Sequence, residues 1–142
     1  MPPERSDHDQ IVDVLVRYAT AIDTRDWPLL TTCFNPDVHA DYGDGVGEWN
    51  DAAAITEYMA VTHRDMRDTK HMLSNFVIEV DGDVASASTY VHAVQVVSDD
   101  PLLWYDCVGR YADRLVRTGS GWRIAERTYH ATRVISSHPL PS

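Results

Sequence analysis

Residues 71–97 carry the strongest structural signal in the chain, and their sequence is HMLSNFVIEVDGDVASASTYVHAVQVV. Two runs rich in Val, Ile, Thr, Tyr and Phe flank the dipeptide Asp81-Gly82, which is typical of a two-residue hairpin turn. The pattern therefore predicts an antiparallel hairpin with strands at His71–Val80 and Val84–Val97.

Two further strand candidates extend this hairpin into a meander. Leu102–Arg117 and Trp122–Ser136 have strand composition, and Gly119-Ser120 lies between them where a turn is needed. The second half of the chain is thus predicted to form four long antiparallel strands.

The first half shows helical periodicity instead. In residues 7–22, apolar side chains recur on one helical face, and Ser6 or Asp7 can cap the start; the face comprises Ile11, Leu15, Tyr18 and Ile22. Asp26 is a candidate cap for a second helix at Trp27–Phe34, and Asn50 or Asp51 for a third that ends near Met66.

The segment between the second and third helices is predicted to be mostly irregular. Asn35-Pro36-Asp37 is expected to form a turn, Val38–Tyr42 a short strand, and the glycine-rich residues 43–47 a loop. Helices followed by a meander predict an α+β fold with helices on one side of a curved sheet. A dinucleotide-binding fold is disfavoured, because no G-x-G-x-x-G follows a strand.

Size and charge narrow the classes of function. The 142 residues suit one domain, expected at 7–136 between a disordered N-terminus, 1–6, and a tail, 137–142. Twelve basic against 22 acidic residues give a net charge of −10, which disfavours nucleic acid and anionic membranes as partners. The polar N-terminus and two cysteines indicate a soluble, cytoplasmic protein without a disulfide framework.

A two-residue turn at Asp81-Gly82 fixes a register that pairs His71 with His92. One face of the hairpin would then carry six mostly polar residues: His71, Leu73, Asn75, Ser88, Tyr90 and His92. Either solvent or a polar pocket inside a curved sheet would explain this face, and a bulge would break the register.

The register predicted for the second hairpin, between Leu102–Arg117 and Trp122–Ser136, contains one favourable and one unfavourable pair. A turn at Gly119-Ser120 sets Leu115 sensibly against Ile124. The same register sets Asp113 against Glu126, which is unfavourable because the charges are alike. A bulge between the two pairs is therefore expected.

Five segments together resemble the SnoaL-like family of the NTF2-like superfamily over about residues 7 to 135. They are RYATAIDTRDW at 17–27, Asp41-Tyr42-Gly43, His71-x-x-x-Asn75, Gly109-Arg110-Tyr111-x-Asp113 and Gly121-Trp122-Arg123-Ile124-x-x-Arg127. The resemblance implies a cone-shaped α+β barrel, in which three N-terminal helices and a strongly curved antiparallel sheet enclose a pocket. The chain looks most like the branch that holds scytalone dehydratase, bile acid 7α-dehydratase and lindane dehydrochlorinase.

That branch implies an Asp–His pair, and Asp23 and His71 match its two positions. Tyr18 and Tyr42 match pocket tyrosines of the dehydratases, and Arg127 matches an arginine of several members. His92 falls where one of these enzymes has a catalytic aspartate. We therefore expect Asp23, His71, Tyr18 and His92 to be catalytic, and a second set to bind substrate: Tyr42, Asn75, Tyr90 and Arg127.

The implied chemistry is a cofactor-independent elimination, such as a dehydration, on a small and largely apolar cyclic or polyketide-like molecule. An imidazole held by a carboxylate can act as a general base without a metal, and the seven histidines show no metal-ligand spacing. Long strands leave sheet surface outside the cone, so a homodimer or homotrimer is expected.

Two alternatives stay open. A ketosteroid-type isomerase or polyketide cyclase could use the same pocket, the isomerase with Asp41 as base and Tyr18 on the oxyanion. A non-catalytic ligand-binding module is also compatible with the fold. Substitution of Asp23 or His71 should abolish a lyase, substitution of Asp41 an isomerase, and none of these should affect a scaffold.

Overall fold

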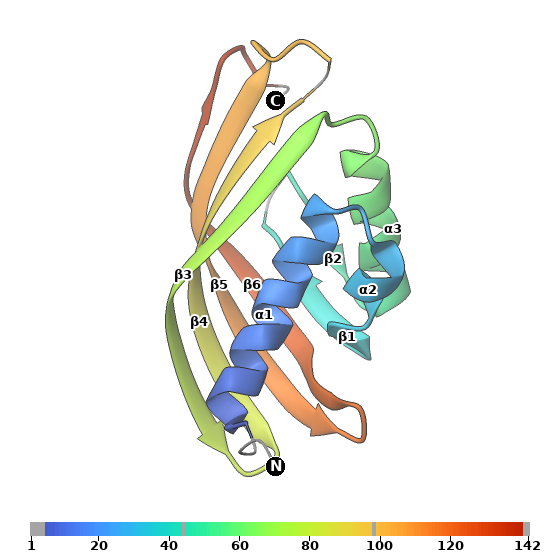
Figure 1. Ribbon diagram of the computed structural model, residues 1–142, viewed down its shortest axis with the longest axis vertical. Coiled ribbons are helices and arrows are strands. Elements are labelled where there is room, and N and C mark those ends of the chain that lie inside the picture. The colour runs from blue at the N-terminus through green and yellow to red at the C-terminus, as the bar shows by residue number, and fades with distance from the viewer. Residues whose placement is uncertain (1–4, 44, 98, 141–142) are drawn as a thin grey trace.

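The computed structural model describes residues 5–43, 45–97 and 99–140, and there three helices lie on one side of a curved sheet (Figure 1). The helices are α1 (Asp7–Asp23), α2 (Trp27–Thr31) and α3 (Ala52–His63). The six strands are β1 (Phe34–Asp41), β2 (Glu48–Trp49), β3 (Asp68–Asp81), β4 (Val84–Val96), β5 (Trp104–Thr118) and β6 (Gly121–Ser136). The predicted α+β class and the four long strands are confirmed.

Helix α1 forms as its periodicity predicts. The Ser6 side chain accepts a hydrogen bond from the Asp9 backbone N–H and caps the helix. Its apolar face is fully buried against the sheet, and each such side chain stabilises the fold by about 1.5–3 kcal/mol; the face comprises Ile11, Leu15, Tyr18 and Ile22. The helix ends at Asp23, and Arg25 just beyond it has the left-handed backbone, at φ 59°, that commonly follows a helix.

The predicted turn at Asn35-Pro36-Asp37 is wrong, because these residues lie inside β1. Helix α2 ends at Thr31, and the strand begins at Phe34. The ladder between β1 and β6 is irregular between Phe34 and His39, so the missing N–H of Pro36 costs no regular ladder bond there.

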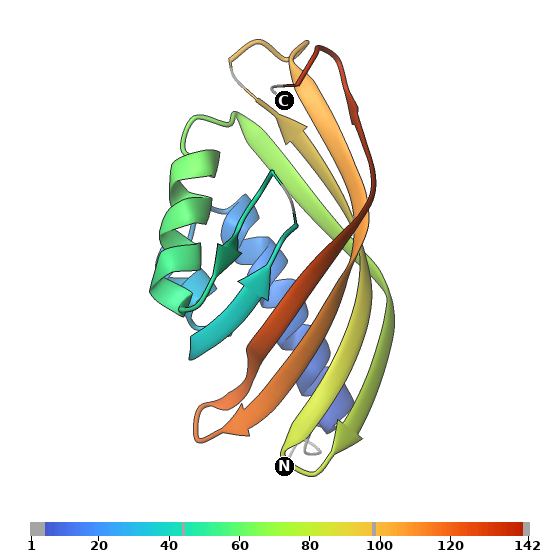
Figure 2. The ribbon, with the colours of Figure 1, turned by 180° about the vertical axis from the view of Figure 1, so that it is seen from behind.

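The sheet has the order β2-β1-β6-β5-β4-β3. The long strands pair antiparallel, but β1 pairs parallel with β6, so the expectation of a purely antiparallel sheet is wrong. The sheet is also not closed into a barrel, since β2 and β3 are its two edges. Figure 2 shows the short strands β1 and β2 between α3 and β6, where they extend the curved sheet beside the helix.

The predicted register of the β3–β4 hairpin is wrong. Asp81 pairs with Val84, so the turn residues are Gly82-Asp83, and a bulge follows between Ser74 and Val77. Asn75 in this bulge has φ 54°, a left-handed conformation that Asn tolerates better than most residues. The bulge turns His71 toward the concave face and leaves His92 on the convex face.

The predicted bulge in the β5–β6 hairpin is confirmed. Leu115 pairs with Ile124 as expected, and the register then shifts between Arg114 and Leu115. The shift replaces the unfavourable pairing of Asp113 with Glu126 by a pairing of Asp113 with Arg127.

The structure describes the two ends of the chain only in part. Residues 1–4 and 141–142 fall outside the described residues, so the expectation of disorder there stays a prediction. Ser6 caps α1, and the Ser137 backbone N–H donates to the carbonyl of Trp104. Among the described residues, no helix has the length and apolar character needed to cross a membrane.

Candidate active site

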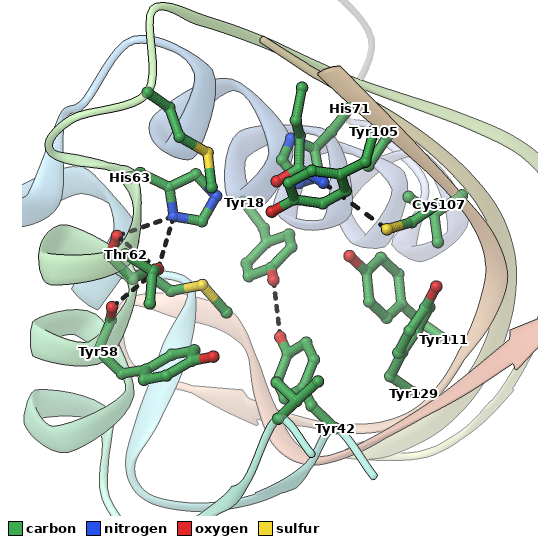
Figure 3. Close-up of a pocket in the computed structure, with 16 residues that line it drawn as sticks. Tyr18, Tyr42, Tyr58, Thr62, His63, His71, Tyr105, Cys107, Tyr111 and Tyr129 are labelled. Atoms are coloured by element: carbon green, nitrogen blue, oxygen red, sulfur yellow. Dashed lines mark hydrogen bonds between the residues drawn. The ribbon is translucent and has the colours of Figure 1, made fainter. Parts of the chain in front are cut away.

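A cavity of about 260 Å³ lies between the concave face of the sheet, α3 and the C-terminal half of α1 (Figure 3). Six of the seven tyrosines of the chain line it, and both sulfur-containing and aliphatic side chains fill the gaps. The six are Tyr18, Tyr42, Tyr58, Tyr105, Tyr111 and Tyr129. The remaining lining residues are Val46, Met59, Thr62, His63, Met66, His71, Val91, Ala93, Gln95 and Cys107.

Asp23 and His71 meet at one wall of this cavity, as the sequence predicts. The carboxylate Oδ1 of Asp23 accepts from His71 Nδ1 at 2.7 Å, and its Oδ2 accepts from the His71 backbone N–H at 2.8 Å. The side chains are largely buried, with 8% of His71 and 17% of Asp23 exposed. One carboxylate thus fixes both the backbone and the ring of the histidine.

A second layer of hydrogen bonds holds the carboxylate. The Thr69 hydroxyl donates to Asp23 Oδ1 at 3.0 Å and accepts from Arg25 Nη1 at 2.9 Å. Arg25 also donates to the carbonyls of Ile22 and Met66, so it ties the end of α1 to the segment that enters β3. This network sets the direction of the Asp23 carboxylate.

The hydrogen bonds fix the protonation pattern of the pair. Although partial burial by itself raises the pKa of Asp23, hydrogen bonds from His71 and Thr69 lower that pKa below its ordinary value of 3.8. A carboxylate only accepts, so His71 Nδ1 carries the proton and Nε2 of the neutral ring keeps a lone pair. His71 lines the cavity while Asp23 stands behind it. The arrangement can accept a proton from a molecule in the cavity.

Tyr18 and Tyr42 also reach the cavity, and their hydroxyls are 2.7 Å apart. Figure 3 shows this hydrogen bond across the floor of the space. Burial raises the pKa of Tyr18 and of Tyr42 well above 10, so both phenols are protonated at neutral pH. The Tyr18 hydroxyl also interacts with that of Tyr111, so the phenols form a hydrogen-bonded group at this side of the cavity.

Arg127 lies behind the tyrosines rather than on the lining. Its Nε and Nη2 donate to Asp113 at 2.7 and 2.8 Å, and its guanidinium lies over the rings of Tyr18 and Tyr111 at 4.2 and 3.8 Å. The side chains of Arg127 and Asp113 are almost completely buried. The structure thus places Arg127 as a support of the cavity wall and not in contact with its contents.

Four other predicted residues lie outside the cavity. His92 and Tyr90 are exposed on the convex face, where His92 Nε2 is 3.7 Å from Asp106, so the prediction that they share a face with His71 is wrong. Asn75 is exposed in the β3 bulge. Asp41, the base of the alternative isomerase, accepts from the Gly43 backbone N–H and does not line the cavity.

His63 is a cavity residue that the sequence interpretation gave no role. It follows Met59 by four positions, the spacing of one helical face, so its inward direction was available from periodicity. Its Nδ1 lies 2.8 Å from the carbonyl of Met59 and 3.0 Å from the Thr62 hydroxyl. Burial lowers the pKa of His63 from 6.5 to about 4, which keeps the ring neutral at neutral pH.

Gln95, Tyr105 and Cys107 also line the cavity, and the sequence interpretation gave none of them a role in the site. The alternation along β4 brings Val91, Ala93 and Gln95 to the concave face, and the Gln95 amide lies 3.7 Å from Cys107 Sγ. Burial raises the pKa of Tyr105 to about 12. Within the described part of the chain, no three His, Cys, Asp or Glu side chains gather as metal ligands.

Comparison with known proteins agrees with this architecture. The profile of the SnoaL-like domain matches residues 3–128. The chain belongs to the SnoaL-like family. An uncharacterized protein of Mycobacterium tuberculosis, Rv2910c, is 35% identical over 124 residues, which cover 87% of this chain and 84% of that protein. The family resemblance drawn from the motifs is confirmed.

Solved structures share the fold over most of the chain. A Novosphingobium aromaticivorans protein provisionally named an aromatic ring hydroxylase is 28% identical, with a TM-score of 0.84 and 92% of each chain covered. A protein of the same organism provisionally named a scytalone dehydratase is 20% identical, with a TM-score of 0.82 and coverage of 93% and 88%. The hexachlorocyclohexane dehydrochlorinase LinA is 15% identical, with a TM-score of 0.79 and coverage of 90% and 86%. The SnoaL-like chain thus has the NTF2-like fold.

Proposed function

We propose that this SnoaL-like protein is a cofactor-independent lyase that eliminates water or a similar leaving group from a small, largely apolar cyclic molecule. The observation that carries the proposal is the hydrogen bond from His71 Nδ1 to Asp23 at the wall of a tyrosine-lined cavity. Two proteins of the same fold are named as a dehydratase and a dehydrochlorinase, which are eliminating enzymes.

His71 is the proposed general base. Its Nε2 removes a proton from a carbon next to a carbonyl, while Asp23 stabilises the imidazolium that forms. The electron pair of the broken C–H bond forms a C=C bond as the C–O bond at the next carbon breaks. A cavity phenol gives its proton to the departing hydroxyl, and His71 later returns a proton to the phenolate. The products are an unsaturated ketone and water.

The cavity supports this chemistry in two further ways. A phenol of the cavity lining, in the group that contains Tyr18 and Tyr42, can donate to the carbonyl oxygen as negative charge develops there. The apolar and aromatic lining limits water around the base, which strengthens both hydrogen bonds. A second base is not proposed, because Asp41 does not line the cavity.

The test is enone formation from a panel of 3-hydroxycycloalkanones, followed by ultraviolet absorbance. Asp23→Asn and His71→Ala are expected to lower kcat by about 10²–10⁴, the usual contribution of a general base. Asp65→Asn is the matched control, since that side chain is 89% exposed, and it should keep the full rate. Undiminished turnover in His71→Ala would contradict the proposal.

A second measurement tests proton removal by His71 on molecules that carry no leaving group. Wild-type protein should catalyse exchange of the α-hydrogens of cycloalkanones with deuterium oxide, which ¹H NMR detects directly. His71→Ala should lose this exchange. Equal exchange rates with wild type, with His71→Ala and with buffer alone would also count against His71 as base.

A further inference from the structure

The cavity holds a second imidazole, His63, whose chemistry the proposed elimination does not use. It is only 7% exposed, lies at the last position of α3 and lines the same space as His71. The two ring centroids are 6.2 Å apart. A buried histidine at this distance from the proposed base faces whatever molecule the base acts on.

The hydrogen bonds of His63 decide which of its nitrogens faces the cavity, and in what form. The Met59 carbonyl accepts from Nδ1, and the Thr62 hydroxyl already donates to the carbonyls of Tyr58 and Met59. Both partners therefore accept from Nδ1, which must carry the proton. In the neutral ring Nε2 is then a pure acceptor, and no described residue hydrogen-bonds to it. Figure 3 shows the His63 ring directed from α3 toward the inside of the cavity.

His71, on strand β3, has its two ring nitrogens in the same arrangement as those of His63. Its Nδ1–H is held by Asp23, so Nε2 of the neutral ring is also an acceptor. Two acceptor nitrogens therefore meet in one cavity whose other polar groups are mostly phenols. Neither nitrogen can donate to the other, and no phenol of the described lining is hydrogen-bonded to His63 Nε2, so this nitrogen can accept a hydrogen from a ligand.

We infer that His63 is a specificity-determining residue that accepts a hydrogen bond from a hydroxyl group of the substrate. The substrate class is accordingly a cyclic molecule that carries a hydroxyl in addition to its leaving group. His63 positions this hydroxyl and does not protonate it, because the only N–H of the neutral ring is engaged by Met59. The inference rests on the proposed function only in that it takes this cavity as the substrate site.

The test uses binding rather than turnover, so that it can fail independently of the lyase proposal. The probes are 4-ethylphenol and 4-ethylanisole, which differ in whether the oxygen carries a hydrogen. Their dissociation constants are measured by NMR titration on wild type, His63→Phe and His71→Phe. The ratio of the two constants isolates the hydroxyl contribution in each protein.

Wild type should prefer the phenol by about 3–10-fold, as expected for one hydrogen bond of about 1 kcal/mol. His63→Phe should abolish this preference, whereas His71→Phe should keep it. A preference that survives in His63→Phe, or disappears only in His71→Phe, overturns the inference. Failure of wild type to bind either probe overturns it too.

A second measurement needs no variant, in case His63→Phe does not fold. Long-range ¹H–¹⁵N correlation of the wild-type imidazoles resolves the unprotonated Nε2 of His63. 4-Ethylphenol should move this ¹⁵N resonance upfield, as an unprotonated nitrogen does when it accepts a hydrogen bond, and 4-ethylanisole should not. Equal shifts with both probes would refute the assignment.

Discussion

Among single residues, Thr69 decides how firmly Asp23 holds the His71 ring. It is 1% exposed and connects the Arg25 guanidinium to the Asp23 carboxylate by two hydrogen bonds. The first effect of removing its hydroxyl falls on Asp23, which loses one of the bonds that lower its pKa. The second falls on Arg25, which loses a buried acceptor.

Thr69→Val is therefore expected to raise the pKa of Asp23 toward 3.8 and to lower the unfolding free energy by about 1–3 kcal/mol. Because the folded-state pKa of Asp23 lies below its unfolded value, its stabilisation is present at neutral pH and is lost as pH falls through the folded-state pKa. Part of the destabilisation by Thr69→Val should therefore disappear in acid. Carboxyl ¹³C NMR titration and urea unfolding measure both effects, and the exposed Thr31→Val serves as control.

His63 also makes the stability of the protein depend on pH, but here the folded state favours the neutral form of the side chain rather than the charged form. Its pKa falls from 6.5 to about 4 on burial, so the unfolded chain binds a proton that the folded protein excludes. Stability is therefore complete above pH 6.5 and declines as pH falls toward 4, by at most about 3 kcal/mol from this residue. Urea unfolding from pH 7 to pH 4 should show a shallower decline in His63→Gln. Parallel curves for the two proteins would argue against a buried neutral imidazole.

At the scale of the element, the bulge in β3 decides which side chains reach the cavity. One extra residue in the strand brings both His71 and Ile78 to the concave face, although an unbroken alternation would separate them. Asn75 makes this possible through its left-handed backbone, at φ 54°. The function of the strand thus depends on the conformation of one exposed residue.

Asn75→Val should lower the unfolding free energy by about 1–2 kcal/mol, because a β-branched residue is strained in that conformation. Asn75→Gly should stay within about 0.5 kcal/mol of wild type, since glycine adopts it freely. Urea unfolding distinguishes the two. Equal losses in both variants would mean that the Asn75 side chain, rather than its backbone, stabilises the bulge.

At the scale of the whole molecule, the Arg127–Asp113 pair joins strands β5 and β6 to helix α1. The carboxylate holds the guanidinium from β5, and the ring of Tyr18 covers it from α1. Both charges are buried, so each depends on the other. The pair is therefore a structural support of the cavity wall that carries Tyr18.

Arg127→Met should lower the unfolding free energy by about 3–5 kcal/mol, because it leaves the Asp113 carboxylate buried without a partner. The double variant Arg127→Met, Asp113→Leu should recover most of that loss, since it removes the unpaired charge as well. Thermal and urea unfolding of the three proteins provide the comparison. A double variant no more stable than Arg127→Met would contradict this account.

The sequence by itself determined those features that depend on residues close together in the chain, namely the helix and strand positions and one bulge. Periodicity located α1 and its buried face, composition and turn signals located the four long strands, and the like-charged pairing of Asp113 with Glu126 indicated a bulge that the structure contains. The family motifs pointed to Asp23 and His71, which do meet. The inferences about helices, strands and the bulge succeed because capping, side-chain period and turn chemistry act over a few residues, whereas the pairing of Asp23 with His71 came from the family resemblance.

Only the tertiary structure decided the face on which each strand residue lies and which residues share the cavity. The bulge at Asn75 places His71 on the same face as Gln95 and opposite to His92, and helix α3 brings the His63 ring to 6.2 Å from the His71 ring. A one-residue change of register reverses every side chain of a strand, and its free energy is set by packing between elements distant in sequence. That long-range balance is absent from any local pattern of residues.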